Sequence, residues 1–132
     1  DALDAERIAL RTELGYGAPH FPLADHYARE GEEWMYGRGA HDKLTDSGDW
    51  REHIVLTEHR YMLEDTRFGL SLICSAGRWA GVATPIAAGF LAIASAIVGR
   101  DLYAEGRTLE SLGLAALSRG EMRKLLQQGL VL

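Results

Sequence analysis

The feature that most constrains the fold is the run TPIAAGFLAIASAIVG, residues 84–99, which is apolar along nearly its whole length. Thr84 suits a helix N-cap, Pro85 the first helical position, and Gly99 the C-terminal stop. A helix that is apolar nearly all round is predicted to be buried. The run is too short, and too rich in Thr, Ser and Gly, to span a bilayer comfortably. We therefore expect a central buried helix, rich in Ala and Gly, rather than a membrane segment.

Helical patterns occupy most of the remaining chain. Residues 2–14 predict a helix that stops at Gly15 and Gly17, and LADHYAREGEEWMYG predicts one or two short helices. Residues 66–80 predict an amphipathic helix ended by Gly81, with one shared face made of Phe68, Leu72, Ala76 and Trp79. Ser118 and Glu121 have the spacing of a capping box, and residues 38–50 predict an irregular loop. No run alternates like a strand, so the prediction is one all-α domain over residues 1–132.

Charge and cysteine content exclude several classes of function. The net charge of −5 argues against nucleic acid as the main partner, because phosphate binding needs a basic face. Residues 1–65 carry 15 acids and 7 Lys or Arg, a net −8, which predicts a solvated acidic surface. Cys74 is the single cysteine and lies in an apolar run, which favours a buried, inert thiol. With no signal peptide pattern, a cytoplasmic location is expected.

No motif for a nucleotide or a metal is present. The glycine pairs at 15 and 17 and at 37 and 39 follow no strand and lack the third glycine of a dinucleotide loop. The five histidines, at 20, 26, 41, 53 and 59, form neither HxxxH nor HExxH. His20 and His26 flank an apolar turn and are expected to hydrogen-bond there. We therefore predict no cofactor-binding and no metal-binding residues in this chain.

The stretch HRYMLEDTRFGL, residues 59–70, concentrates the reactive side chains. In a purely structural interpretation, Asp65 caps the following helix and Arg60 pairs with Glu64 four residues on. In a functional interpretation, Arg60 grips a substrate carboxylate with its two-pronged guanidinium. Asp65 then orients an imidazole that comes from elsewhere. Neighbours that could share such a site are His59, Tyr61, Glu64 and Arg67.

The motifs LDAER, HRYMLEDTRFGL, GVATP and GRDLYAEGRTLESLGL, in this order, resemble the C-terminal helical domain of the octopine/nopaline (opine) dehydrogenase family. The resemblance spans about residues 3–114. It implies a fold similar to the C-terminal domain of 6-phosphogluconate-dehydrogenase-like enzymes. It also implies an N-terminal Rossmann domain, absent from this chain, that binds NAD or NADP. Such enzymes condense an amino acid with a 2-oxo acid reductively, and run the reverse oxidation.

The resemblance assigns roles to two residues. Asp65 matches the catalytic aspartate and Arg60 the substrate-carboxylate arginine, while the catalytic histidine would lie upstream of this chain. Arg67 stands where the family usually has proline, and Ala83 where proline is common, so substrate preference is left open. Arg107 is interpreted as structural, or as an anchor for the wall of the site.

Three hypotheses remain open on sequence grounds. The first is the substrate and catalytic-support domain of an opine-type dehydrogenase, inactive without its nucleotide-binding half. The second is a stand-alone helical dimerisation or interaction module whose chemistry is lost, associating through residues 84–98. The third is a small metal or ligand binder that uses the N-terminal histidines. The chain starts without Met and already in a helical pattern, so we expect a fragment of a longer protein. A fragment that lacks its partner domain would expose the apolar face that normally packs there, so we also expect a homo-oligomer.

Overall fold

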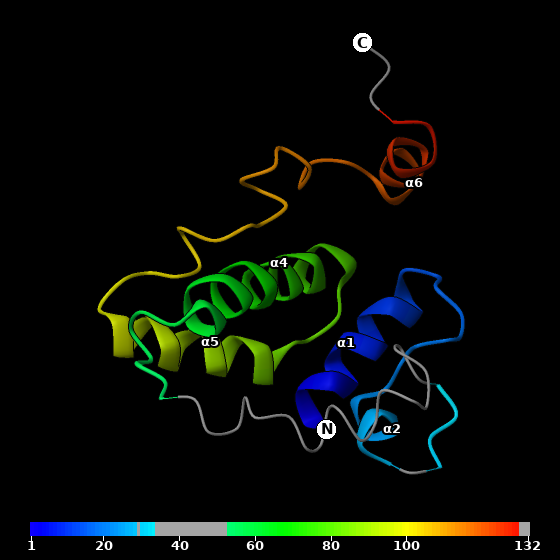
Figure 1. Ribbon diagram of the computed structural model, residues 1–132. Coiled ribbons are helices and arrows are strands. Elements are labelled where there is room, and N and C mark those ends of the chain that lie inside the picture. The colour runs from blue at the N-terminus through cyan, green and yellow to red at the C-terminus, as the bar shows by residue number, and fades with distance from the viewer. Residues whose placement is uncertain (29, 34–52, 130–132) are drawn as a thin grey trace.

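The computed structural model describes residues 1–28, 30–33 and 53–129, and within these the chain is helical with no strand, as the sequence predicted. The helices are α1 (Ala2–Glu13), α2 (Leu23–Tyr27), η3 (Tyr61–Leu70), α4 (Ser71–Ala80), α5 (Pro85–Val98) and α6 (Arg119–Gln128). Helices α1, η3, α4 and α5 pack on one another (Figure 1). None of the described helices is long and apolar enough to cross a membrane. The loop predicted at 38–50 lies outside the described residues.

Helix α5 begins and ends where local chemistry predicts. Pro85 occupies its first turn, and Gly99 ends it in the left-handed conformation at φ 68°. The predicted side-chain cap is wrong, however, because the Thr84 side chain accepts no capping hydrogen bond. Instead the Glu6 carboxylate of α1 accepts the N–H groups of Ile86 at 2.6 Å and Ala87 at 2.9 Å. A residue 80 positions away therefore caps α5 and ties it to α1.

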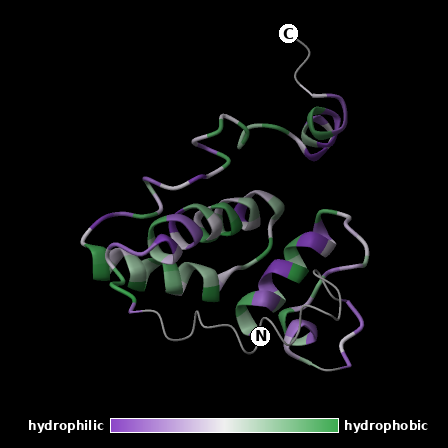
Figure 2. Ribbon diagram, viewed as in Figure 1, coloured by the Kyte–Doolittle hydropathy of each residue, from purple (hydrophilic) through white to green (hydrophobic). Residues whose placement is uncertain are grey.

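The burial of α5 corrects the expectation of a helix buried all round. Its inner face supplies Ala87, Leu91 and Ala94 to a core completed by Cys74 and Leu102. Its outer face exposes four large side chains, Ile86, Phe90, Ile93 and Ile97, of which Ile93 is 59% exposed. Figure 2 shows the resulting band of hydrophobic colour along α5. The small residues allow close packing on one side only, and the apolar opposite side is left open.

The helical segment that precedes α5 begins earlier than predicted. Helix η3 runs directly into α4, so the chain is helical from Tyr61 to Ala80 and ends at Gly81 with φ 75°. The predicted face is also wrong, since Phe68, Leu72, Ala76 and Trp79 are only partly buried. The buried residues of α4 are instead mostly small: Ser71, Cys74, Ser75, Gly77 and Ala80. Small side chains let the segment that follows α5 approach α4 closely.

Helix α6 lies beyond this core and is attached at its start. The predicted capping box is confirmed, because the Ser118 and Glu121 side chains each bond the other's backbone N–H. The indole of Trp79 donates to the carbonyl of Leu117 at 2.8 Å. Arg119 donates to the carbonyl of Ala80 at 2.6 Å and pairs with Glu13. These contacts hold α6 against the C-terminal ends of α4 and α1 (Figure 1).

Candidate functional site

Helix η3 is wound as a π-helix over ten residues. Such helices are wider than α-helices and bond each N–H to a carbonyl five residues back; they are rare, and single turns of this kind are frequent at functional sites. The side chain of Thr66 makes a hydrogen bond over the same five residues, because its hydroxyl donates to the carbonyl of Tyr61 at 2.9 Å. Asp65 lies in the middle of this helix, so it caps no helix end. The interpretation of Asp65 as an N-cap is therefore wrong.

Asp65 faces an open, mainly apolar groove of roughly 400 Å³. The groove lies between η3, α1 and α5, and its walls are Leu3, Met62, Thr66, Leu70, Phe90, Ile93, Ala94 and Ile97. Asp65 is the single ionisable side chain among these lining residues. Its carboxylate is exposed and makes no hydrogen bond or ion pair within the part of the chain that the structure describes. A carboxylate so placed is able to accept a hydrogen bond from a group that enters the groove.

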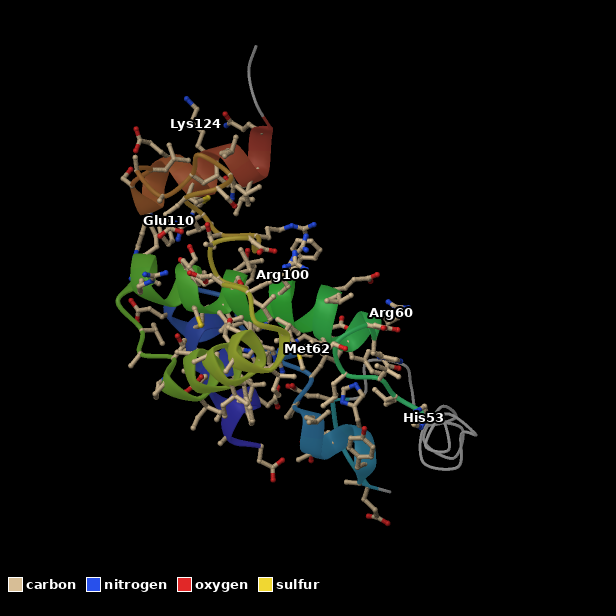
Figure 3. All side chains as sticks on the ribbon, turned by 90° about the vertical axis from the view of Figure 1, so that its left-hand side faces the viewer. His53, Arg60, Met62, Arg100, Glu110 and Lys124 are labelled. Carbon is tan, nitrogen blue, oxygen red and sulfur yellow. The ribbon has the colours of Figure 1, made fainter. Side chains whose placement is uncertain are left out.

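Arg60 lies at the start of η3, outside the residues that line this groove. In Figure 3 its side chain extends outward from the helix, whereas Met62 lies toward α5. Its guanidinium pairs with Glu64 at 3.6 Å, and the two side chains are 67% and 59% exposed. The predicted i,i+4 pair is therefore confirmed, and it is of the weak surface kind, worth about 0–1 kcal/mol. No ion pair or hydrogen bond between described residues joins Arg60 to Asp65.

The four other predicted neighbours of the site contact side chains other than Asp65. The His59 and Tyr61 rings contact each other with centroids 4.5 Å apart, and the Tyr61 N–H donates to His59 Nδ1 at 3.2 Å. Glu64 is exposed and engaged with Arg60. Arg67 lies away from the groove, with its guanidinium carbon 4.2 Å from the centroid of the Phe68 ring. None of these four side chains is among the residues that line the groove with Asp65.

The histidines give no metal centre among the residues described. No group of three or more His, Cys, Asp or Glu side chains there has the arrangement to hold a metal ion. His20 Nδ1 accepts from Arg11 at 3.4 Å, and His26 Nδ1 lies 3.1 Å from the carbonyl of Pro22. The prediction that these two histidines hydrogen-bond around the apolar turn is confirmed. His41 lies outside the described residues.

Comparison with known proteins gives two matches. The family described as NAD/NADP octopine/nopaline dehydrogenase, alpha-helical domain, matches residues 1–98 of the 132. The chain belongs to this family. An opine dehydrogenase of Arthrobacter sp. (strain 1C) is 37% identical over 68 residues, which cover 52% of this chain and 19% of the relative. The chain therefore spans about a fifth of the length of that relative.

The family match includes three of the four motifs that carry the resemblance. LDAER, HRYMLEDTRFGL and GVATP lie inside it, so η3 with Arg60 and Asp65 belongs to the octopine/nopaline dehydrogenase helical domain. The fourth motif, at 99–114, lies beyond the matched residues. Arg67 is inside the match and Arg107 outside it. The structure nevertheless places these two arginines on the same aromatic ring, Phe68.

Sequence reasoning missed a second hollow in this opine dehydrogenase domain. It measures roughly 560 Å³, lies between α4, α5 and the segment after α5, and is lined in part by Cys74, Arg78, Asp101 and Tyr103. The Arg78 guanidinium carbon lies 4.5 Å from the Tyr103 ring centroid. Burial raises the pKa of the Cys74 thiol, although a hydrogen bond with Thr84 opposes this, so the prediction of an inert thiol holds. The residues of this hollow are dispersed along the chain, so spacing gave no signal.

Proposed function

We propose that this chain is the substrate-side, catalytic-support domain of an NAD(P)-dependent opine-type dehydrogenase. The complete enzyme would join an amino acid to a 2-oxo acid by reductive condensation, run the reverse oxidation, and act in the cytoplasm. The family membership supports the class of reaction. The observation that carries the proposal is the Asp65 carboxylate, exposed at the edge of an apolar groove and without a partner among the described residues.

The role proposed for Asp65 follows from this environment. An imidazole that enters the groove from the remainder of the enzyme would donate one ring N–H to Asp65. That hydrogen bond fixes the tautomer and stabilises the charged imidazolium while the opposite nitrogen moves the proton of the reaction. The apolar walls, including Phe90 and Ile93, would keep water away from this hydrogen bond. Asp65 thus acts as a positioning residue for the base.

Arg60 is proposed to bind a substrate carboxylate. Its present partner, Glu64, holds it only at 3.6 Å on an exposed surface. Such a pair costs little to break, so the guanidinium can turn toward a ligand without a large loss of stability. A planar guanidinium donates two parallel hydrogen bonds to a carboxylate, which Lys cannot reproduce. Arg60 would therefore orient the oxo acid or amino acid at the mouth of the groove.

The nicotinamide coenzyme would be held elsewhere in the complete enzyme. Dinucleotide binding uses a strand, a glycine-rich turn and a helix N-terminus, and the described residues contain no strand. The coenzyme, when bound, supplies the hydride. This chain alone is accordingly predicted to bind no NAD(P) and to be inactive.

Paired variants of the adjacent carboxylates test the role of Asp65. In the complete protein, coenzyme oxidation with pyruvate and a panel of amino acids should be measurable. Asp65→Asn should lower kcat by about 10²–10⁴-fold, the range of a general acid–base contribution. Glu64→Gln is the matched control, because it removes an equally exposed neighbouring charge, and it should leave kcat nearly unchanged. Equal activity of Asp65→Asn and wild type would contradict the proposal.

Variants of Arg60 test the substrate role separately. Arg60→Ala should raise KM for one carboxylate substrate by about tenfold or more, since a charge-assisted hydrogen bond is lost. Arg60→Lys should fail to restore KM, because the two-pronged geometry is lost although the charge is kept. If neither change affects KM, Arg60 does not bind the substrate carboxylate.

A second candidate function rests on the outer face of α5. Ile86, Phe90, Ile93 and Ile97 form an exposed apolar stripe that would favour a stand-alone interaction module working by self-association. Sedimentation velocity of the 132-residue chain tests this. A dimer that Ile93→Gln dissociates, together with a complete protein that lacks dehydrogenase activity, would favour the module over the enzyme.

A further inference from the structure

Outside the residues that line the groove, two arginines share one aromatic ring. The guanidinium carbon of Arg67 lies 4.2 Å from the centroid of the Phe68 ring, and that of Arg107 lies 5.4 Å from the same centroid. We infer that Arg67 and Arg107, held on Phe68, form a binding site for a small oxyanion, a carboxylate or a phosphate. The name "arginine pair" is used below for these two residues. This inference does not depend on dehydrogenase activity.

The first observation is an unsatisfied donor. The Nε–H of Arg67 is shut off from solvent and has no hydrogen-bond acceptor among the residues that the structure describes. Buried polar groups are nearly always hydrogen-bonded, and each exception requires an explanation. A positively charged donor without an acceptor is costly, because burial removes its water and nothing replaces it. An anion that neutralises this guanidinium would remove much of that cost.

The second observation is that the nearby acids are already occupied. Glu105 is electrostatically attracted to Arg67, but its two oxygens accept hydrogen bonds from Nε and Nη2 of Arg100. This hydrogen bonding with Arg100 is the main reason that the pKa of Glu105 is lowered, and Arg67 contributes only a weaker attraction. Asp101 accepts the N–H groups of Tyr103 and Ala104, both at 3.0 Å. Within the described residues, neither arginine of the pair has an acid within ion-pair distance.

The third observation is that the backbone fixes this arrangement. Gly106 lies so close to the η3–α4 junction that a Cβ there would come within 2.6 Å of the Arg67 carbonyl oxygen and also meet the Ser71 side chain. The Ser71 hydroxyl donates to the carbonyl of Leu102 at 3.2 Å. The segment that carries Arg107 is therefore anchored next to Phe68.

Charge and geometry together identify the ligand class. Glu105 is paired with Arg100, whereas no ion pair between described residues includes Arg67 or Arg107. The Phe68 ring restrains the guanidinium groups through cation–π contact, so less freedom is lost when a ligand binds. Guanidinium groups match the planar oxygens of a carboxylate and the oxygens of a phosphate. A metal cation or an apolar molecule would find no suitable partner there.

The test follows the guanidinium groups directly by NMR. In ¹H–¹⁵N spectra of the 132-residue chain, the Arg67 Nε–H should give a separate, slowly exchanging signal because it is buried. Inorganic phosphate and succinate are titrated at matched ionic strength, with chloride as the reference anion. Saturable shifts of the Arg67 and Arg107 signals with either oxyanion are expected. Saturation with phosphate alone would assign a phosphoryl ligand, and saturation with succinate alone would assign a carboxylate.

Three variants decide whether the arginine pair is responsible. Arg67→Gln and Arg107→Gln should each weaken the affinity by about tenfold, the effect of losing a charge-assisted hydrogen bond. Arg107 is exposed, so its variant should fold even where Arg67→Gln does not. Arg123→Gln, an equally exposed arginine on α6, is the matched control and should change nothing. Shifts that do not saturate, or an unchanged affinity in Arg107→Gln, would overturn the inference.

Discussion

The long helical segment from Tyr61 to Ala80 has two sides that are built differently. Toward residues 102–110 its contacts are polar and closed: Ser75 donates to Glu110 at 2.5 Å and accepts the N–H of Leu109 at 2.8 Å. Toward α1 and α5 they are apolar and open, and they form the groove that contains Asp65. The hydrogen-bonded side fixes where the helix lies, and the open side presents the Asp65 carboxylate on that support. A carboxylate can be held in a fixed position only if the element that carries it is rigid, and the hydrogen bonds of the closed side provide that rigidity.

The largest expected effect on stability is on the closed side, at Gly106. Gly106→Ala should lower the free energy of unfolding by about 3 kcal/mol, the upper end of overpacking, because the new Cβ would meet the Arg67 backbone and the Ser71 side chain. Gly69→Ala is the control, since nothing lies within 4 Å of a Cβ there. That control should keep or raise the stability. Urea denaturation measures both, and equal behaviour of the two variants would show that the closed side is not tightly packed.

Ser75 gives the next largest effect. Ser75→Ala removes two hydrogen bonds from a side chain that is 1% exposed and leaves the buried N–H of Leu109 without its acceptor. A loss of about 1–2 kcal/mol is expected in chemical denaturation. Thr66→Ala removes a hydrogen bond on the groove side of the same helix. It should lower the free energy of unfolding by less than Ser75→Ala does, because that hydrogen bond is exposed. A larger loss at Thr66 would show that the π-helical winding, rather than the closed side, stabilises the segment.

A substitution on the open side should affect stability least. Ile93→Gln changes a side chain that is 59% exposed, so the free energy of unfolding should change by no more than about 0.5 kcal/mol. Thermal unfolding at a concentration where the chain is monomeric provides the measurement. A loss comparable to that of Ser75→Ala would mean that the groove is closed in solution and that the two sides are alike.

The smallest effect expected for the closed side is on the pH dependence of the free energy of unfolding. The hydrogen bond from Ser75 is the main reason that the pKa of Glu110 is lowered. A folded-state pKa below the unfolded value of about 4.3 means that the unfolded chain binds more protons between the two values. The contribution is therefore complete above about pH 4.3 and is lost as the pH falls through the lower, folded-state pKa. Glu110→Gln should flatten this acid limb of the unfolding profile, and an unchanged slope would argue against the Ser75–Glu110 bond.

The sequence predicted most of the helices, because their signals are local. Pro85 and Gly99 bound α5, Gly81 ends α4, and Ser118 with Glu121 begins α6, each through the backbone preferences or capping chemistry of residues a few positions apart. The family motif containing Arg60 and Asp65 could likewise be found in the sequence. The weak Arg60–Glu64 pair followed from its i,i+4 spacing.

Other features depended on contacts between distant parts of the chain. Hydropathy predicted α5 to be buried all round, but burial depends on which neighbours are present, and the described residues cover one face only. The buried face of α4 has small residues, rather than the larger side chains that periodicity favoured, because Gly106 lies close against the Ser71 side chain. The cap of α5 came from Glu6, because a free backbone N–H can donate to any carboxylate that packing brings near.

The candidate site likewise has some features that the sequence determined and others that only the tertiary structure decided. Sequence alone determined that an arginine and an aspartate lie five residues apart in a helical, apolar context. Only the tertiary structure decided that this segment winds as a π-helix, that Asp65 faces the groove, and that Arg67 shares an aromatic ring with Arg107. Helix ends are set by short-range bonding along the backbone, whereas the direction of a side chain depends on the elements that fold against it, and those are distant in sequence.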